Sequence, residues 1–221
     1  IRRDVLAAAR QRHGGKAAEA VLAHIRATTE GVEAVLRDAV QDGHEVVATG
    51  RRNNAVEISR GEALETAGVH LIEGSLVDAQ FARRVTEGCH GIIHLAAAQH
   101  ESNVPDEYFR QVNVDGTRTL LDAAVSQGVR RFVYGSTIGV YGSAAESKLD
   151  EASPPHPANA YGRTKLQAQS LVRGYSARLA RDRAQAEPAS RLNAAGCRRV
   201  MVPCSIFSSP AACQVRSCLL T

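Results

Sequence analysis

The sequence predicts a doubly wound α/β fold, in which helices cover both faces of a parallel sheet. Short apolar runs alternate with longer helical patterns between residues 34 and 140. Each run is rich in Val, Ile, Leu or aromatic residues, as expected of strands that are buried on both faces. The chain has 221 residues, and we expect a single domain that spans 1–221.

Four apolar runs are the predicted strands, at 45–48, 69–72, 92–95 and 131–134. Three segments have a helical pattern, at 34–41, 112–127 and 159–177. Gly43 and Gly128 follow the first two segments, and glycine commonly ends a helix. The order of strand, helix and strand predicts right-handed crossovers between parallel strands. Residues 1–33 have a mostly helical pattern, whereas 178–221 show little periodicity.

Charge and cysteine content argue against several classes of protein. The net charge is only +4, and arginines are interleaved with acidic residues, which does not fit a nucleic-acid-binding surface. The 5 cysteines are odd in number and form no Cys-x-x-Cys pair, so we expect free thiols, no metal site and a cytoplasmic location. No apolar run reaches the roughly eighteen residues of a membrane span, and we expect neither a span nor a secretory leader.

Tyr161 and Lys165 form the first candidate catalytic pair. Their i, i+4 spacing places them one turn apart on one face of the predicted helix 159–177. An ammonium group at that position lowers the pKa of a phenol, which then serves as an acid or base near neutral pH. The alternative is an exposed pair without a role, because Tyr-x-x-x-Lys occurs by chance in many chains.

Ser136 and Thr137 follow the predicted strand 131–134. Ligands of open α/β sheets bind at the carboxyl ends of the strands, where a hydroxyl can hydrogen-bond a substrate oxygen beside Tyr161. The alternative is a Ser/Thr pair that only caps the strand before a loop.

Several motifs, in this order along the chain, resemble the extended short-chain dehydrogenase/reductase family of the NAD-dependent epimerase/dehydratase type. They are a strand-Ser-Thr-x-x-Val-Tyr-Gly segment at 132–142 and the Tyr-x-x-x-Lys motif at 161–165. Residues 91–97 resemble the family's fourth strand with its Ala-rich turn, and 113–117 its Asn-x-x-Gly-Thr helix signature. Residues 200–203, with Ile206 and Phe207, are a looser likeness to its sixth strand. The resemblance covers 34–173 and implies a Rossmann-like sheet, whereas 1–33 and 178–221 diverge.

The resemblance implies roles for the matched residues. Tyr161 would be the general acid/base, and Lys165 would hold the nicotinamide ribose and tune Tyr161. Thr137 takes the position of the catalytic hydroxyl, and Asn113 that of a structural or proton-relay asparagine. The implied reaction is hydride transfer between a nicotinamide and a carbon that bears oxygen, on a nucleotide sugar or a similar small molecule.

The end of the second family strand bears on the choice of cofactor. An acidic residue there usually bonds the adenosine ribose of NAD, but this chain has Gly50 followed by Arg51 and Arg52. Arginine pairs well with a 2′-phosphate, so NADP is favoured over NAD. Two exposed loop arginines are the alternative. The remaining cofactor-binding residues implied by the resemblance are Ser75, where many relatives have Asp, and Leu76, Leu95, Ala96, Ala97, Ser136 and Pro203.

Two departures from the family pattern limit these expectations. The family's Gly-rich turn, which meets the pyrophosphate, should lie near 26–32, after a candidate first strand at 21–25. Only Gly31 is found there, and Glu30 adds a carboxylate. The family also continues into a substrate domain, which we expect to be largely absent from a chain that ends at Thr221.

Two functions therefore stay open. The chain is either an enzyme of this family or a non-catalytic or truncated relative that keeps the fold and binds cofactor poorly. A nucleotide-sensing or scaffold protein would keep cofactor binding and lose the Tyr/Lys pair, which is nearly the reverse of this sequence. A homodimer is left open, and the substrate and the choice among reductase, epimerase and dehydratase are not predicted.

Overall fold

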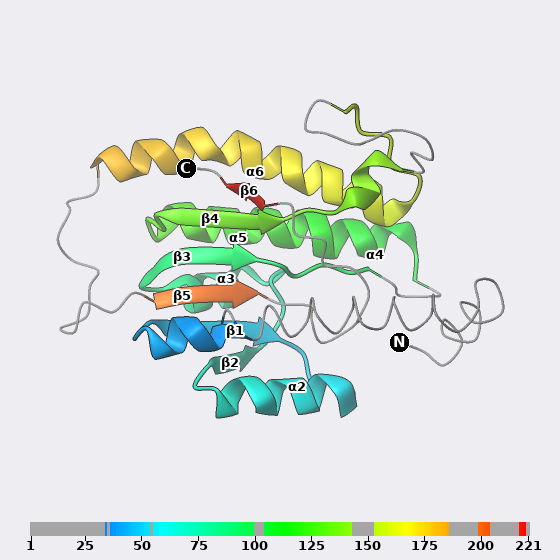
Figure 1. Cartoon of the computed structure of the whole chain (residues 1–221). Helices are drawn as coiled ribbons and strands as arrows, with labels where there is room; N and C mark the ends of the chain where they lie inside the picture. The colour runs from blue at the N-terminus through cyan, green and yellow to red at the C-terminus, as the bar shows by residue number, and fades with distance from the viewer. Residues whose placement is uncertain are drawn as a thin grey trace.

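Five parallel strands run side by side through the centre of the protein, with one short antiparallel strand at an edge (Figure 1). A computed structural model describes residues 34, 36–53, 55–99, 104–142, 153–185, 199–203 and 217–219. The strand order is β2-β1-β5-β3-β4-β6. The strands are β1 (Glu45–Gly50), β2 (His70–Glu73), β3 (Cys89–His94), β4 (Arg131–Gly135), β5 (Arg199–Pro203) and the antiparallel β6 (Ser217–Leu219).

Helices connect the strands and pack on the sheet. They are α2 (Ala55–Thr66), α3 (Ala79–Thr86), α4 (Asp106–Arg110), a π-helical turn η1 (Gln111–Asp115), α5 (Gly116–Ser126), a 3₁₀ turn η2 (Ile138–Tyr141) and α6 (Ala160–Gln185). A helical segment at 36–41 precedes β1. Together the helices and the parallel strands make the predicted doubly wound, Rossmann-like fold.

The sheet is apolar on both faces, as the sequence pattern predicts. In β1, Val47 belongs to a core cluster with residues of α3, α5 and α6, whereas Val46 and Ala48 belong to a second cluster with Leu36 and Leu64. Because side chains alternate along a strand, consecutive buried residues must enter two different cores. The apolar runs of the sequence therefore correspond to strands that are covered on both sides.

The central position of the sheet is filled by β5, which lies between β1 and β3 (Figure 1). Met201 is the register partner of both Val47 and Ile92, and the Leu95 amide extends the pairing by donating to the Pro203 carbonyl at 2.9 Å. In the usual doubly wound order this place belongs to the first strand of the chain. The prediction of a strand at 200–203 is confirmed. The resemblance of these residues to the family's sixth strand does not predict that the strand lies at the centre of the sheet. Residues 21–25 and the expected glycine turn at 26–32 lie outside the described residues, as do Ile206 and Phe207.

The other predicted elements agree with the structure to within a few residues, with one substantial difference. The helix expected at 112–127 is divided into the π-helical turn η1 and the α-helix α5, and the short helix α4 precedes them. A start signal for α4 is present in the sequence, since Pro105 is followed by Asp106 and Glu107, and acidic residues stabilise the first turn of a helix. Within the described ranges, no helix is both long enough and apolar enough to cross a membrane.

The central placement of β5 predicts that Met201 contributes strongly to stability. Met201 is fully buried between the strands on either side, so Met201→Ala should lower the free energy of unfolding by about 2–5 kcal/mol. Val77, which is 45% exposed, provides the control, and Val77→Ala should cost less than about 0.5 kcal/mol. Urea unfolding followed by circular dichroism measures both. Equal, small losses would contradict a central β5.

Candidate functional site

Most of the predicted site residues lie along one edge of the sheet. Five strands are parallel, so their carboxyl ends, at Gly50, Glu73, His94, Gly135 and Pro203, share this edge. The segments that leave these ends carry the following predicted residues: Arg51 and Arg52, Ser75 and Leu76, Leu95, Ala96 and Ala97, and Ser136 and Thr137. The fold therefore brings together residues that are far apart in the sequence, at the edge where doubly wound sheets bind ligands.

Thr137 and Tyr161 approach each other across Gly139. Thr137 caps the turn η2, and its hydroxyl accepts a hydrogen bond from the Gly139 amide at 3.2 Å. A methyl group built on Gly139 would lie 3.5 Å from the Thr137 hydroxyl oxygen and 4.0 Å from the Tyr161 ring. The two side chains therefore flank the same small residue. Both side chains lie beside Gly139, and their joint action on a substrate oxygen stays a prediction.

The start of α6 is fixed against η2 by close backbone packing. Asn159 accepts a hydrogen bond from the Gly162 amide at 2.8 Å, as an N-terminal cap does. A side chain on Gly162 would come within 2.5 Å of the Gly139 carbonyl oxygen, so only glycine fits at that contact. On the exposed side of the helix, Arg163 pairs with Asp106 of α4 at 2.9 Å. These contacts set the position of Tyr161 relative to Thr137.

Lys165 is almost completely buried beneath this edge, with 2% of its surface exposed. Its ammonium donates to the Gly135 carbonyl oxygen at 2.6 Å and lies 4.3 Å from the centre of the Tyr134 ring. A charged hydrogen bond and a cation–π contact both stabilise an ammonium that has lost water. The exposed-pair alternative is therefore wrong for Lys165.

His94, at the end of β3, is the next buried polar group. Its ring lies 5.6 Å from the Tyr134 ring, and its Nε2 shares a hydrogen bond of 2.9 Å with the Thr117 hydroxyl. Burial lowers the pKa of His94 to about 3, and the charge of Lys165 acts in the same direction. His94 is therefore neutral at physiological pH. The sequence motif contained His94 and Tyr134, but nothing in their spacing assigned them a role.

Asn113 is held in a way that favours its structural role. Its side-chain oxygen accepts from the Ala98 amide at 2.7 Å, and its nitrogen donates to the Ala98 carbonyl and to the Thr164 hydroxyl, each at 3.0 Å. Asn113 thus ties the loop after β3 to α6, from a position that is 1% exposed. A part in proton transfer stays a prediction.

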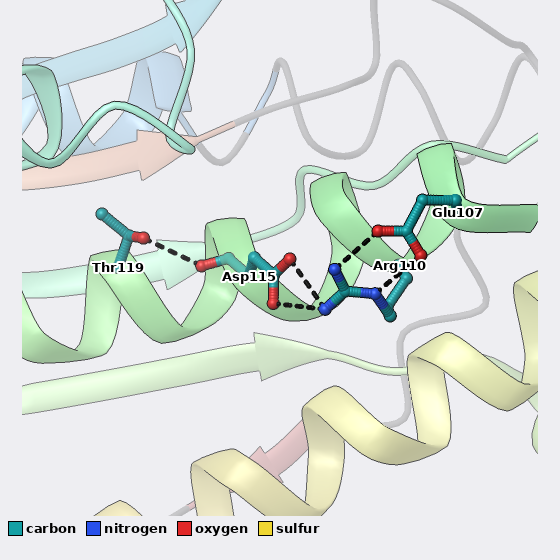
Figure 2. Close-up of polar contacts among 4 residues, drawn as sticks. All are labelled: Glu107, Arg110, Asp115 and Thr119. Carbon is teal, nitrogen blue, oxygen red and sulfur yellow. Dashed lines mark hydrogen bonds and ion pairs between the residues drawn. The ribbon is translucent and has the colours of Figure 1, made fainter.

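The π-helical turn that carries Asn113 is braced on its outer side by Arg110. Figure 2 shows the Arg110 guanidinium between Glu107 and Asp115. Its shortest contacts with these two carboxylates are 2.6 and 2.9 Å. The Thr119 hydroxyl donates to the Asp115 carbonyl oxygen at 2.9 Å. Exposed ion pairs of this kind contribute little free energy each. Arg110 and Asp115 lie at the two ends of the π-helical turn, so their ion pair holds the shape of the turn. Asn113, which belongs to this turn, is buried.

The two arginines after β1 have different surroundings. Arg52 pairs with Glu65 at 2.6 Å and with Glu73 at 3.4 Å, so its charge is already matched by two carboxylates. Arg51 is exposed, and its guanidinium donates to the Tyr108 hydroxyl at 3.4 Å. The two loop arginines are therefore not equivalent, because Arg52 is paired with two carboxylates, whereas Arg51 contacts an uncharged hydroxyl.

The other predicted cofactor-binding residues lie at the same edge, and their contacts with a cofactor stay predictions. The Ser136 hydroxyl donates to Gln169 of α6 at 2.8 Å, a partner that sequence reasoning missed. The Ser75 hydroxyl accepts from the Val77 amide at 3.4 Å, and Leu76 packs against the core. Pro203 reaches the edge through the central β5. Cys89 is buried with a free thiol, and the described residues contain no group of three or more side chains suited to a metal.

Comparison with known proteins decides the family. A model of the NAD dependent epimerase/dehydratase family matches residues 33–182, which is more than half of the chain. The protein belongs to the NAD-dependent epimerase/dehydratase family. The matched residues include Thr137, Tyr161 and Lys165, so the predicted motifs lie within the region of family likeness.

Two enzymes and one crystal structure illustrate the likeness. UDP-glucose 4-epimerase of Streptomyces lividans is 36% identical over 116 residues, which is 50% of this chain and 35% of that protein. dTDP-D-glucose 4,6-dehydratase of Mus musculus is 37% identical over 109 residues, 48% of this chain and 31% of that protein. The chain therefore spans about a third of the length of these two family members.

The crystal structure is that of a double mutant of DesIV, a dTDP-glucose 4,6-dehydratase from Streptomyces venezuelae, with NAD and DAU bound. It superposes with a TM-score of 0.54 at 30% identity, and the match covers 60% of this chain and 42% of that one. The likeness supports the doubly wound fold found here.

The neutral His94 predicts a loss of stability in mild acid. The unfolded chain takes up a proton on this histidine below pH about 6.5, whereas the folded protein does so only near pH 3. Stability is therefore lost as the pH falls below about 6.5, by roughly 1.4 kcal/mol per pH unit from this group. Urea unfolding at about pH 7 and pH 5.5 measures the loss.

His94→Gln is the matched control, because glutamine can still hydrogen-bond Thr117 but does not titrate. Its loss between the two pH values should be smaller than that of the wild type by about 1.4 kcal/mol. Equal losses in the two proteins would show that His94 is not held neutral.

Proposed function

We propose that this chain carries the cofactor-binding and acid/base part of an NAD(P)-dependent enzyme that acts on a hydroxyl or carbonyl carbon. The observation that carries the proposal is the arrangement of Thr137, Tyr161 and Lys165 at the carboxyl edge of the sheet. The names of the similar enzymes, a UDP-glucose 4-epimerase and two dTDP-glucose 4,6-dehydratases, support a nucleotide sugar as the substrate class.

In the proposed mechanism, the Tyr161 phenol exchanges a proton with the reacting hydroxyl of the substrate. The Thr137 hydroxyl donates a hydrogen bond to the same oxygen from the opposite side of Gly139. The Lys165 ammonium, one turn along the helix, favours the deprotonated form of Tyr161. These three groups are fixed by η2, by Gly162 and by the buried contacts of Lys165, so little reorganisation is needed when a substrate binds.

A nicotinamide cofactor would supply the hydride acceptor and donor. Its fit is supported by the sheet edge, where the small residues Ala96 and Ala97 follow β3 and Ser136 follows β4. Arg51 would pair with a 2′-phosphate, which favours NADP, with NAD as the alternative. Arg52 would first have to leave Glu65 and Glu73, so we assign the larger contribution to Arg51.

The second candidate function is that of a relative that keeps the fold without turnover. It is favoured by the sequence at 26–32, where the family's Gly-rich turn should approach the pyrophosphate but Gly31 is the only glycine. The two candidates differ in whether substrate is converted. A homodimer also stays a prediction, and sedimentation velocity at micromolar concentration would distinguish it from a monomer.

Tyr161→Phe should remove turnover while leaving the fold intact. The expected loss is at least about 100-fold, the usual contribution of a positioned acid/base group. Interconversion of UDP-glucose and its 4-epimer, or loss of water from dTDP-glucose, can be followed by proton NMR with NADP or NAD present.

Tyr175→Phe is the matched control on the same helix. Its hydroxyl bonds Asp122 on the outer surface at 2.8 Å, so the variant should keep full activity. Equal activity of the wild type and Tyr161→Phe would reject the assigned role. Wild-type protein that binds cofactor but converts neither substrate would favour the non-catalytic relative.

Arg51→Ala should weaken NADPH binding by about tenfold or more and leave NADH binding nearly unchanged, because a charged contact to phosphate is lost. Arg52→Ala should leave the ratio of the two dissociation constants close to that of the wild type. Fluorescence titration of each variant with both cofactors gives the ratios. A ratio that is unchanged in Arg51→Ala would reject the contact with the 2′-phosphate.

A further inference from the structure

The ammonium of Lys165 occupies a defined niche, which consists of the Tyr134 ring, the Gly135 carbonyl and the neighbouring His94 ring. The Nζ atom is 2.6 Å from the carbonyl oxygen and 4.3 Å from the ring centre. Tyr134 and His94 are themselves 1% and 2% exposed. The niche thus comes from the ends of β3 and β4, whereas the lysine comes from α6.

The niche matters because lysine has a long, flexible side chain. Without fixed contacts, an ammonium gains by turning toward water, because its desolvation is costly. In this protein the carbonyl and the face of the phenol ring replace water around the charge. They therefore determine on which side of α6 the charge is held, and Tyr161 lies on that side, one turn away.

The Tyr134 hydroxyl is not what makes the niche. It is buried and has no hydrogen-bond partner among the described residues. Leaving a buried hydroxyl without a partner costs free energy, so a phenylalanine would fit here at least as well. The Lys165 ammonium contacts the electron-rich face of the Tyr134 ring, and phenylalanine has the same kind of face.

The other groups that face Lys165 are compatible with its charge. His94 from β3 is neutral, as its burial requires, and Thr117 from α5 is an uncharged hydroxyl that bonds His94. Tyr134 from β4 is buried and its pKa is raised, mainly by burial, so it stays protonated. Tyr161, on α6 itself, also faces this region, because its charge acts on the pKa of Tyr134.

We propose that Tyr134 is a positioning residue, whose ring, together with the Gly135 carbonyl, holds the Lys165 ammonium where its charge acts on Tyr161. This inference rests on the proposed acid/base role of Tyr161. It assigns to the last aromatic residue of β4 a part in the chemistry, although Tyr134 is itself buried and 1% exposed.

The first test compares three variants on the ionisation of Tyr161 in the protein without substrate. Tyr134→Leu should raise the pKa of Tyr161 by about one unit, a tenfold weaker acid, whereas Tyr134→Phe should leave it unchanged. Phe132→Leu is the matched control, because Phe132 lies two residues earlier on the same strand and is equally buried. It loses a ring of similar size and should leave the pKa of Tyr161 where it is.

Tyrosinate absorbance during a pH titration measures the ionisation, and subtraction of the same titration with Tyr161→Phe isolates Tyr161. Thermal unfolding checks that each variant is folded. An unchanged Tyr161 in folded Tyr134→Leu, or an equal shift in Phe132→Leu, would overturn the proposal. The readout needs neither cofactor nor turnover, so its failure is distinguishable from that of the proposed function.

The second test uses the wild-type protein and holds even if Tyr134→Leu does not fold. The chain has 3 lysines, Lys16, Lys148 and Lys165, so lysine-labelled protein gives a simple NMR spectrum. One lysine side chain should show the upfield shift caused by an aromatic ring face, and Lys165→Met should remove that signal. The shift should persist in Tyr134→Phe. A Lys165 signal at the position of a solvent-exposed lysine would overturn the proposal.

Discussion

The pairing of a central strand with both of its neighbours is the constraint on which the rest of this structure depends. A parallel sheet that is covered on both faces has no water to satisfy the backbone groups of its inner strands, so a gap between β1 and β3 would leave each of them unpaired on the side that faces the gap. β5 fills that gap, and its Met201 and Val202 enter the two cores on opposite faces of the sheet. Because β5 is parallel to its neighbours, five carboxyl ends meet at one edge.

The candidate site follows from that edge together with the packing of α6. The strand ends supply Thr137, the Gly135 carbonyl and the rings of His94 and Tyr134. The helix supplies Tyr161 and Lys165, and Gly162 allows its backbone to approach η2 closely. Asn113 and the braced π-helical turn connect the loop after β3 to the same helix. Burial of Lys165 among these groups links the stability of the fold to the acid/base chemistry that we propose.

Much of this could be predicted from the sequence, because parallel strands that are buried on both faces leave a clear pattern. The strands at 45–48 and 131–134 and the helix with the Tyr-x-x-x-Lys motif were predictable on that ground. The place of β5 was not, since periodicity shows that Val200, Met201 and Val202 form a strand but not which strands they join. The pairing of Arg52 with Glu65 and Glu73 could not be predicted for a similar reason, because these residues come together only in the folded chain. The niche of Lys165 depends on three elements and has no signature in any one of them.

We propose that this sheet edge binds a nicotinamide dinucleotide, although the expected glycine turn is not present in the sequence at 26–32. The direct measurement is thermal unfolding of the full chain with increasing NADPH or NADH. A ligand that binds only the folded state raises stability by about 2.7 kcal/mol at a concentration of 100 times its dissociation constant. We expect a melting temperature that rises progressively with cofactor concentration, whereas an unchanged melting temperature at millimolar NADPH and NADH would contradict binding at this edge.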